Sequence, residues 1–369
     1  MIFEKLGNKK YLLLHYKNIE MHKAYFNDRH TNSWEITEII RIFNILGWNV
    51  ELVDRTVTNW VPTRNYDLFI SNSSGSSGDN FVVMSEKIPS TFKVMYAAGP
   101  AVDISNQLVN QRYEDLIIRK NLKIPVEPLR TFKTDIDTIM RHTNEIICID
   151  DNGFSSNSYR RFAKPIHLLN PSSSPGAFDS RQTILKKNKN KFLLFLGNGF
   201  IAKGGDVVLD ALQYVPKIEL NICGPYKSDA LFWKLYKKTI KHNSNINSFG
   251  YVHIGSRKYF NIVRDSQWQI HNSAAEGCAT AVTTLLRAGI VPISNYESGV
   301  DINEIGVHIK NTNNDNVAST VLAIEKALDS KDNSIDEFMQ SIYRQSVRFT
   351  RERFTFNFLQ IAEKIIRDL

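Results

Sequence analysis

The sequence has few cysteines and no long apolar segment. Its 369 residues include three cysteines, Cys148, Cys223 and Cys278, all in apolar or glycine-rich surroundings. An odd and sparse set of cysteines argues against a disulfide framework and favours a reducing compartment. The first ten residues lack the apolar core of a signal peptide, and no run approaches the roughly 18 apolar residues that span a bilayer. We therefore expect a cytoplasmic protein.

The composition is ordinary for a globular protein, with an excess of positive charge. Hydrophobic residues make up 42% and charged residues 23% of the chain, and the length suits two domains better than one core. No cysteine or histidine spacing resembles a zinc site. The net charge of +8 would suit nucleotide phosphates, anionic lipid or nucleic acid, although a basic, solvated surface explains it equally well.

Short apolar runs alternate with helical patterns along most of the chain. This alternation predicts parallel sheets that are covered by helices on both faces. Strands are expected at residues 10–16, 48–53, 67–70, 92–96, 145–149, 192–196, 218–223, 246–249, 268–271, 290–293 and 307–309. Helices are expected at residues 34–46 (capped by Ser33), 206–212, 231–242, 256–265, 282–286, 316–328 and 335–369.

A change of composition over residues 171–191 separates the two halves. The segment is rich in serine and proline and then in lysine, with four lysines at residues 186, 187, 189 and 191. The change favours a linker between domains at residues 1–180 and 181–335, followed by a terminal helix at 336–369 that packs back toward the first domain. The lysines suit a solvated loop better than a contact with phosphate or lipid.

A glycine-rich turn follows the strand expected at residues 192–196. It reads Gly-Asn-Gly-Phe-Ile-Ala-Lys-Gly-Gly over residues 197–205 and leads into a helix. Glycines let the backbone approach a phosphate, the helix directs N–H groups toward an anion, and Lys203 adds a full positive charge. The turn is neither a P-loop nor a Rossmann fingerprint. It is nevertheless the clearest phosphate-binding candidate in the sequence.

A second turn, between a strand and a helix, contains a carboxylate among small residues. Residues 273–281 read Ser-Ala-Ala-Glu-Gly-Cys-Ala-Thr-Ala. Glu276 could cap the following helix, because acidic residues are common in first turns. Alternatively, it faces a cleft between two domains and accepts hydrogen bonds from a polyhydroxylated ligand. Ligands of doubly wound sheets bind outside the carboxyl ends of the strands, where both turns are expected.

Several further motifs follow these turns in a fixed order. They are Gly197-Asn198 with Lys203-Gly204, the strand end Gly224-Pro225, the turn Gly250-Tyr251-Val252, the pair Glu276-Gly277, and Gly289-Ile290-Val291-Pro292. In this order the segment 192–328 resembles the nucleotide-sugar-binding domain of GT-B glycosyltransferases, particularly glycosyltransferase family 4. The first half fits by architecture only. The resemblance implies an α/β fold of GT-B type, with two Rossmann-like, doubly wound domains facing a central cleft.

The resemblance also implies roles for individual residues. Lys203 would neutralise the donor diphosphate and stabilise the leaving group as charge develops, and Glu276 would bind hydroxyls of the transferred sugar. The donor-binding set would be Asn198, Gly199, Gly224, Gly250, Tyr251, Gly277, Cys278, Ala279 and Thr284. The family retains the anomeric configuration and usually needs no metal, so we expect no metal and no cofactor beyond the nucleotide-sugar substrate.

Two positions depart from the pattern of the family. Asn198 stands where the family has an arginine, so one of the two cations that hold the diphosphate is missing. Thr284 stands where the family has a second glutamate, which usually contacts the ribose, and a threonine binds less strongly than a carboxylate. Arg257, Lys258 and Arg264 lie nearby in sequence and could compensate, or could be charges on a helix surface.

The first half offers weaker candidates for the acceptor side of the reaction. His15 ends a strand, His30 lies in a long polar loop, and Asp103 follows Gly99-Pro100. Each of them could equally be structural or solvated. The loop at residues 71–78 could line the acceptor side or be a mobile turn. A retaining reaction can pass the acceptor proton to the donor phosphate, so a protein base is not strictly required.

The expected function is retaining transfer of a hexosyl or N-acetylhexosaminyl group from a nucleotide sugar to a saccharide or lipid-linked acceptor, in bacterial surface polysaccharide synthesis. The basic helix at residues 231–242 would suit peripheral contact with an anionic inner membrane, although we favour packing of Leu231, Leu235 and Ile240 into the core. The alternatives are another GT-B enzyme, such as an epimerase or a nucleic-acid glucosyltransferase, and a scaffold that has lost catalysis. Nucleic acid is not the expected partner.

Overall fold

The computed structural model describes residues 2–3, 9–16, 31–57, 59–72, 78–123, 125–133, 135–174, 187–310 and 315–369. The chain divides into two units, each built on its own sheet. Unit 1 comprises Met1–Asn106, Thr131–Ser172 and Thr350–Leu369, and unit 2 comprises Gln107–Arg130 and Ser173–Phe349. Both units are discontinuous in sequence, whereas consecutive blocks were expected, and the boundary expected at residues 180 and 181 lies outside the described residues.

The sheet of unit 1 has seven strands in the order β1-β3-β2-β4-β5-β6-β7. Its neighbours are parallel, except that β1 pairs with β3 in the antiparallel sense. The strands are β1 (Ile2–Phe3), β2 (Tyr11–Tyr16), β3 (Asn49–Asp54), β4 (Leu68–Asn72), β5 (Phe92–Ala97), β6 (Glu145–Ile149) and β7 (Ile166–Leu169). The central strands are buried almost throughout, because helices cover both faces of the sheet.

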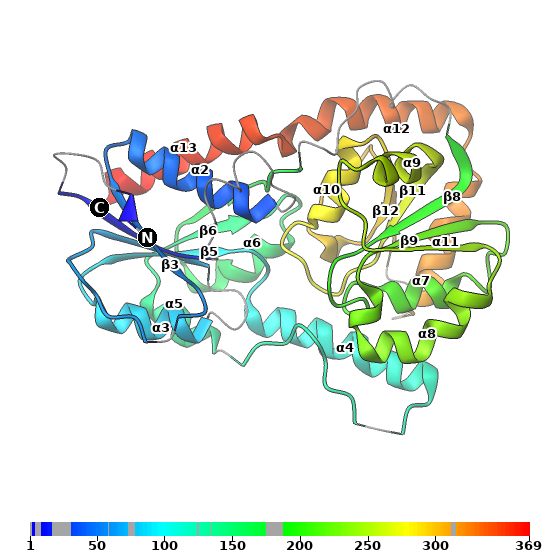
Figure 1. The fold of residues 1–369 in the computed structure, drawn as a ribbon, viewed down its shortest axis with the longest axis horizontal. Helices are drawn as coiled ribbons and strands as arrows, with labels where there is room; N and C mark the ends of the chain where they lie inside the picture. The colour runs from blue at the N-terminus through cyan, green and yellow to red at the C-terminus, as the bar shows by residue number, and fades with distance from the viewer. Residues whose placement is uncertain are drawn as a thin grey trace. The chain divides into compact units, whose positions relative to one another are not determined.

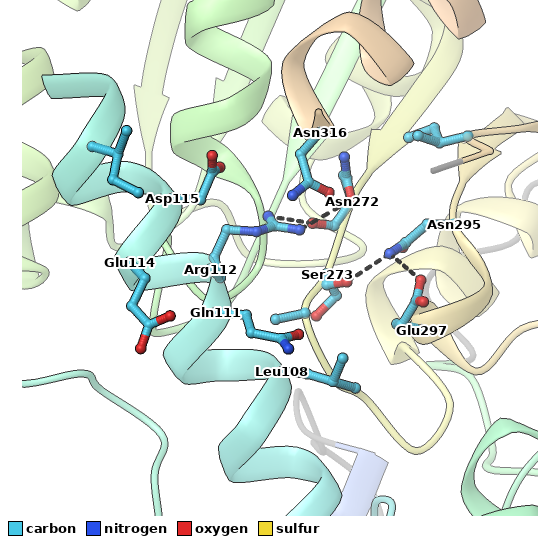
Figure 2. Close-up of a pocket in the computed structure, with 13 residues that line it drawn as sticks. Leu108, Gln111, Arg112, Glu114, Asp115, Asn272, Ser273, Asn295, Glu297 and Asn316 are labelled. Atoms are coloured by element: carbon cyan, nitrogen blue, oxygen red, sulfur yellow. Dashed lines mark hydrogen bonds between the residues drawn. The ribbon is translucent and has the colours of Figure 1, made fainter. Parts of the chain in front are cut away.

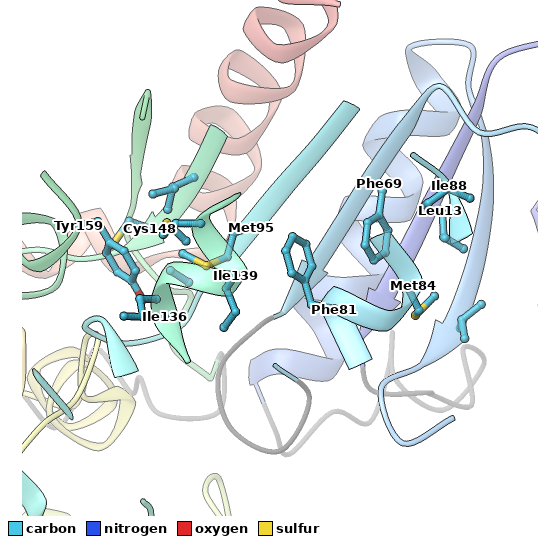
Figure 3. Packing of buried hydrophobic residues seen from close by; sticks show 14 of the residues in the cluster. Leu13, Phe69, Phe81, Met84, Ile88, Met95, Ile136, Ile139, Cys148 and Tyr159 are labelled. Atoms are coloured by element: carbon cyan, nitrogen blue, oxygen red, sulfur yellow. The ribbon is translucent and has the colours of Figure 1, made fainter. Parts of the chain in front are cut away.

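Two pairs of helices cover the sheet of unit 1 (Figure 1). The helices α2 (Thr31–Ile45) and α13 (Arg351–Asp368) lie side by side on one face, where the rings of Trp34 and Phe354 meet edge to face at 5.7 Å. On the other face, α3 (Gly78–Lys87) and α5 (Ile136–His142) cover a buried apolar cluster (Figure 3). This cluster includes Leu13, Phe69, Phe81, Met84, Met95, Ile139 and Cys148. Burying one such side chain stabilises the fold by roughly 1.5–3 kcal/mol.

The long helix α4 (Val102–Lys120) begins in unit 1 and belongs to unit 2 from Gln107 onward. Its last turn is fixed to acidic residues of α7 (Gly205–Ala211) within unit 2. Arg119 Nη2 lies 2.5 Å from Asp206 Oδ2, and Arg119 also pairs with Asp210. Lys120 Nζ lies 2.6 Å from Asp210 Oδ1. These ion pairs explain why the segment groups with a helix that lies about ninety residues further along the chain.

The sheet of unit 2 has six parallel strands in the order β10-β9-β8-β11-β12-β13. They are β8 (Asn188–Phe195), β9 (Glu219–Cys223), β10 (Ile246–Gly250), β11 (Ser266–His271), β12 (Val291–Ser294) and β13 (Val307–His308). One face carries α7, α8 (Ala230–His242) and α11 (Asn316–Leu328), and the other carries α9 (Arg257–Asp265), α10 (Thr280–Arg287) and α12 (Asp332–Gln345) (Figure 1). The carboxyl ends of all six strands therefore lie at one edge of the sheet.

The terminal segment is not the single helix that was expected at residues 335–369. The helix α12 ends at Gln345, a short 3-10 helix, η6, spans Ser346–Phe349, and α13 begins after Thr350. The Phe349 carbonyl accepts hydrogen bonds from the N–H and the hydroxyl of Ser173, at 2.8 and 2.9 Å. The Thr350 hydroxyl accepts from the Arg353 N–H. The helix breaks because the bond that would continue it, from Arg353 to Phe349, is replaced at both ends.

Four helices of unit 1 and its neighbouring segment were not expected from the sequence, namely α3, α4, α5 and α6 (Phe154–Tyr159). Ser33 lies inside α2 rather than capping it, since α2 already includes Thr31. In α8 the buried residues are Phe232, Tyr236 and Ile240. The helix therefore packs into the core as favoured, although through a face that differs from the expected one in two of its three residues.

The lysine run is not a solvated loop where the structure describes it. Lys187 is buried and donates a hydrogen bond of 2.7 Å to the Gly289 carbonyl, and β8 begins at Asn188. Burial lowers the pKa of Lys187 to about 7. Lys191 pairs with Asp265 at 2.5 Å. Lys186 lies outside the described residues, and the run from residue 187 onward is part of the sheet.

Candidate functional site

The glycine-rich turn connects β8 to α7 at the carboxyl edge of the unit 2 sheet. The Lys203 N–H donates a hydrogen bond of 3.0 Å to the Gly199 carbonyl, which closes the turn. Gly204 has a φ of +78°, and a side-chain carbon placed there would lie 2.1 Å from the Asn272 carbonyl oxygen. Only glycine fits this position, because both the backbone conformation and the close approach exclude a Cβ atom. The turn is thereby held directly against the end of β11.

This close approach brings Lys203 together with Glu276, as the sequence analysis suggested for a common site. The Lys203 ammonium forms an ion pair with Glu276 Oε1, and each side chain is 13% exposed. Burial alone would raise the pKa of Glu276, but Lys203 and Arg130 outweigh burial and lower it to about 2. Burial lowers the pKa of Lys203, and Glu276 opposes that shift. Glu276 is therefore a carboxylate at neutral pH, in contact with a cation.

Arg130 is a third member of this site, and sequence reasoning missed it. Its guanidinium Nη2 lies 3.8 Å from Glu276 Oε2, and its side chain is 38% exposed. Its aliphatic stem covers Gly199, where an added side-chain carbon would lie 2.7 Å from Arg130 Cδ. Arg130 belongs to no motif and follows a loop without regular structure, so no signal in the sequence marked it.

Glu276 is not a helix cap. The helix α10 begins at Thr280, and its N-cap is Ala279, which makes no side-chain capping bond. The turn is held instead by backbone bonds from Glu276 to the Glu297 carbonyl and from Ala279 to the Ser298 carbonyl, both at 2.9 Å. The side chain of Glu276 is thus directed to the two cations, which leaves the ligand-binding alternative.

His271, at the end of β11, is a buried neighbour of the three charges. It is fully buried, and neither ring nitrogen has a partner among the described residues. Burial lowers its pKa to about 4, and the nearby positive charge of Lys203 lowers it further, against the opposite influence of Glu276. The imidazole is therefore neutral at physiological pH and adds no positive charge to the site.

The remaining donor-binding candidates are placed along the same edge, with one difference. The Gly224 N–H donates 2.8 Å to the Gly250 carbonyl, which joins the ends of β9 and β10. Asn198 is exposed, and Tyr251 is 63% exposed. Gly277, Cys278 and Ala279 are buried between Glu276 and α10. Thr284 is 2% exposed within α10.

The three basic residues that could compensate for Asn198 have partners elsewhere. The Lys258 ammonium donates to the Phe249 carbonyl at 2.9 Å, and Arg264 donates to Asn261 at 3.0 Å. Arg257 and Lys258 line a hollow beside β10 together with Asn221 and Asn247. These described contacts belong to α9 and β10 rather than to the glycine-rich turn.

A polar cavity of about 350 Å³ adjoins the turn after β11 (Figure 2). Arg112 of α4 reaches the end of β11 and donates hydrogen bonds to the Asn272 carbonyl at 2.8 Å and to Asn272 Oδ1 at 3.2 Å. Asn295 donates to the Ser273 carbonyl and to Glu297, both at 2.7 Å. The lining carries carboxylates and amides, and its described cation, Arg112, is already bonded. Such a lining suits hydroxyl groups better than an anion.

The acceptor-side candidates lie in unit 1. His15, at the carboxyl end of β2, is buried and hydrogen-bonded through Nδ1 to the Ser71 hydroxyl at 2.7 Å. Burial lowers its pKa to about 4, against the influence of Asp54. Asp103 is exposed and pairs with Arg161 at 2.6 Å. His30 and most of the loop at residues 71–78 lie outside the described residues.

Two further properties concern the described part of the chain. Within it, no three His, Cys, Asp or Glu side chains gather in an arrangement that could hold a metal ion, and metal independence stays a prediction. None of the described helices combines the length and the apolar character needed to cross a bilayer.

Comparison with known proteins identifies the fold. No protein-family model and no curated protein matches the sequence. Among solved structures, a glycosyltransferase from Rickettsia africae ESF-5 superposes with a TM-score of 0.62 at 13% identity, over 98% of this chain and 100% of the other. HepE from Anabaena, in complex with UDP and glucose, gives 0.59 at 12% identity, over 98% and 100%. WaaG, a glycosyltransferase involved in lipopolysaccharide biosynthesis, gives 0.53 at 14%, over 96% and 99%.

These neighbours are GT-B glycosyltransferases, and at such identities the likeness shows the fold. The protein has the GT-B fold, an α/β architecture of two Rossmann-like domains with parallel sheets, as the resemblance predicted. Membership of family 4 stays a prediction.

Proposed function

We propose that the protein is a glycosyltransferase that binds a nucleotide sugar at the carboxyl edge of the unit 2 sheet. The observation that carries the proposal is the ion pair of Lys203 with Glu276, beside a glycine-rich turn and at the strand ends where such folds bind ligands. The cation suits a diphosphate, and the carboxylate suits the hydroxyls of a sugar. Solved neighbours of the same fold support it, since HepE was solved with UDP and glucose.

The chemistry follows from where charge develops. When the bond from the sugar to the diphosphate breaks, negative charge grows on the leaving phosphate, and Lys203 stabilises that charge. Because the pKa of Glu276 is about 2, its carboxylate stays ionised and accepts hydrogen bonds from sugar hydroxyls rather than donating a proton. We propose a retaining reaction in which the acceptor proton passes to the donor phosphate. Side-chain cations then neutralise the leaving group, and no metal is required.

We propose a saccharide or lipid-linked acceptor and a role in bacterial surface polysaccharide synthesis. The part that WaaG plays in lipopolysaccharide biosynthesis supports this class of acceptor. The net charge of +8 supports peripheral contact with an anionic membrane on its cytoplasmic face. Acceptor contacts are proposed for unit 1, with His15 and Asp103 as candidates.

A binding protein that has lost catalysis is the second candidate. Asn198 and the buried Thr284 favour it, because each replaces a charged residue of the family pattern. Such a protein would still bind the nucleotide sugar through Lys203 and Glu276. It would not release nucleoside diphosphate from it.

The test is thermal unfolding with a panel of nucleotide sugars and nucleoside diphosphates, for the wild type, Lys203→Ala and Glu276→Ala. A ligand at about a hundred times its dissociation constant stabilises the folded state by roughly 2.7 kcal/mol. We expect at least one nucleotide sugar to raise the unfolding temperature of the wild type, and either substitution to remove most of the shift. Absence of any shift at millimolar concentration would contradict a donor site here.

A further inference from the structure

The charges of the glycine-rich turn do not suffice for a diphosphate. The diphosphate of a nucleotide sugar carries two negative charges, one on each phosphate. Lys203 is a cation, but its ion pair with Glu276 makes the two side chains neutral together. Asn198, also on the turn, is exposed and uncharged; its Oδ1 accepts a long hydrogen bond of 3.5 Å from the Ser228 hydroxyl. A second cation is needed for the site to attract and hold the donor.

Arg130 is placed to be that cation. Its guanidinium reaches Glu276, at 3.8 Å, from the side opposite to none of the buried elements but with 38% of its side chain open to solvent. With Arg130 included, the cluster of Lys203, Glu276 and Arg130 carries a net charge of +1. The long distance to Glu276 leaves guanidinium N–H groups available, and a guanidinium fork matches the geometry of phosphate oxygens.

The backbone holds Arg130 in this position at a cost. Its φ is +72°, in the left-handed region, where a non-glycine residue is destabilised by roughly 1–2 kcal/mol. The preceding residue is tied to α4, because the Leu129 N–H donates a hydrogen bond of 3.2 Å to the hydroxyl of buried Tyr113. The stem of Arg130 then lies over Gly199, where only a glycine leaves room for it. Such strain is typical of residues whose position serves a ligand.

We infer, on the basis of the proposed function, that Arg130 binds the donor diphosphate and supplies the positive charge that Asn198 does not. The ligand-free structure shows Arg130 facing Glu276. On donor binding the guanidinium turns to the phosphate, and Glu276 is released to the sugar hydroxyls. A residue from the segment Gln107–Arg130 thus completes a site whose other charges come from the loops after β8 and β11.

The test compares Arg130→Gln with the wild type, Lys203→Gln and a control, Arg264→Gln. Arg264 is an exposed arginine of α9, bonded to Asn261. Dissociation constants are measured by calorimetry for UDP, GDP and ADP and for the three monophosphates. Loss of one charged contact should weaken diphosphate binding about tenfold to a hundredfold in Arg130→Gln. Monophosphate binding should change less than about threefold, and Arg264→Gln should match the wild type.

Each other outcome has a distinct meaning. If Arg130→Gln binds the diphosphate as the wild type does while Lys203→Gln does not, Arg130 is not a diphosphate ligand and the proposed function stands. An equal loss for monophosphates and diphosphates also overturns the assignment. If the wild type binds no nucleotide, the proposed function itself fails. Because Arg130 is partly exposed, its replacement should move the unfolding temperature by no more than about 2 °C, which a melting curve checks.

Discussion

At the scale of single residues, the candidate site is a carboxylate shared by two cations. Without a ligand, Glu276 satisfies Lys203 and Arg130. A nucleotide sugar would exchange these partners, because its phosphates attract the cations and its hydroxyls donate to the carboxylate. The low pKa of Glu276 keeps the carboxylate ionised for this exchange over the physiological range. The site is therefore stable when empty and still has groups to offer both halves of the donor.

Lys187 makes a separate prediction about stability and pH. Burial lowers its pKa from 10.5 to about 7, so the unfolded chain binds more protons than the folded protein between these two values. This residue therefore makes the protein more stable as the pH rises from 7 toward 10. Lys187→Met should remove that dependence. Relative to wild type, its free energy of unfolding should be about 2–4 kcal/mol more favourable at pH 7 than at pH 10.

Urea denaturation at the two pH values measures this difference. Lys189→Met, at an exposed position of β8, is the control and should show no such dependence. A Lys187→Met effect of the same size at pH 7 and pH 10 would contradict the buried, neutralised lysine.

At the scale of elements, the strands and the two functional turns were predictable, whereas several helices were not. Apolar runs marked the strands, and glycines and small residues marked the turns after β8 and β11, because these loops require close backbone approach. The helix α4 also carries a signal, since Val109, Tyr113 and Leu116 are buried at helical spacing. Its partners could not be predicted, because they are charges far along the chain. The break before α13 depends in the same way on Ser173.

The attachment of α4 to α7 is testable by removing Arg119. Asp206 is fully buried, and Arg119 supplies its described ion pair at 2.5 Å. Arg119→Met should leave a buried carboxylate with too little compensation and lower the free energy of unfolding by about 3 kcal/mol. Arg161→Met, which breaks the exposed pair with Asp103, should cost less than about 1 kcal/mol. Chemical denaturation of both variants makes the comparison, and equal effects would show that the α4 pair is not structural.

At the scale of the whole molecule, the GT-B fold could be predicted because it is written in local patterns. Alternating strands and helices imply two parallel sheets, and the order of motifs places the donor site on the second. The division into units could not be predicted, since Gln107–Arg130 joins unit 2 through contacts distant in sequence. Arg130 was missed for the same reason. The missing cation at Asn198 was evident from the resemblance, but its replacement became visible only in three dimensions.

The most direct measurement is the release of nucleoside diphosphate from the nucleotide sugar that binds, with and without a saccharide acceptor, for the wild type and Glu276→Gln. The amide keeps the shape of Glu276 but removes the charge that holds Lys203 and Arg130. The account predicts release by the wild type, faster with an acceptor, and a loss of roughly a hundredfold or more in Glu276→Gln while the variant stays folded. Release at equal rates by both proteins, or binding without any release by the wild type, would contradict a glycosyltransferase site at Glu276.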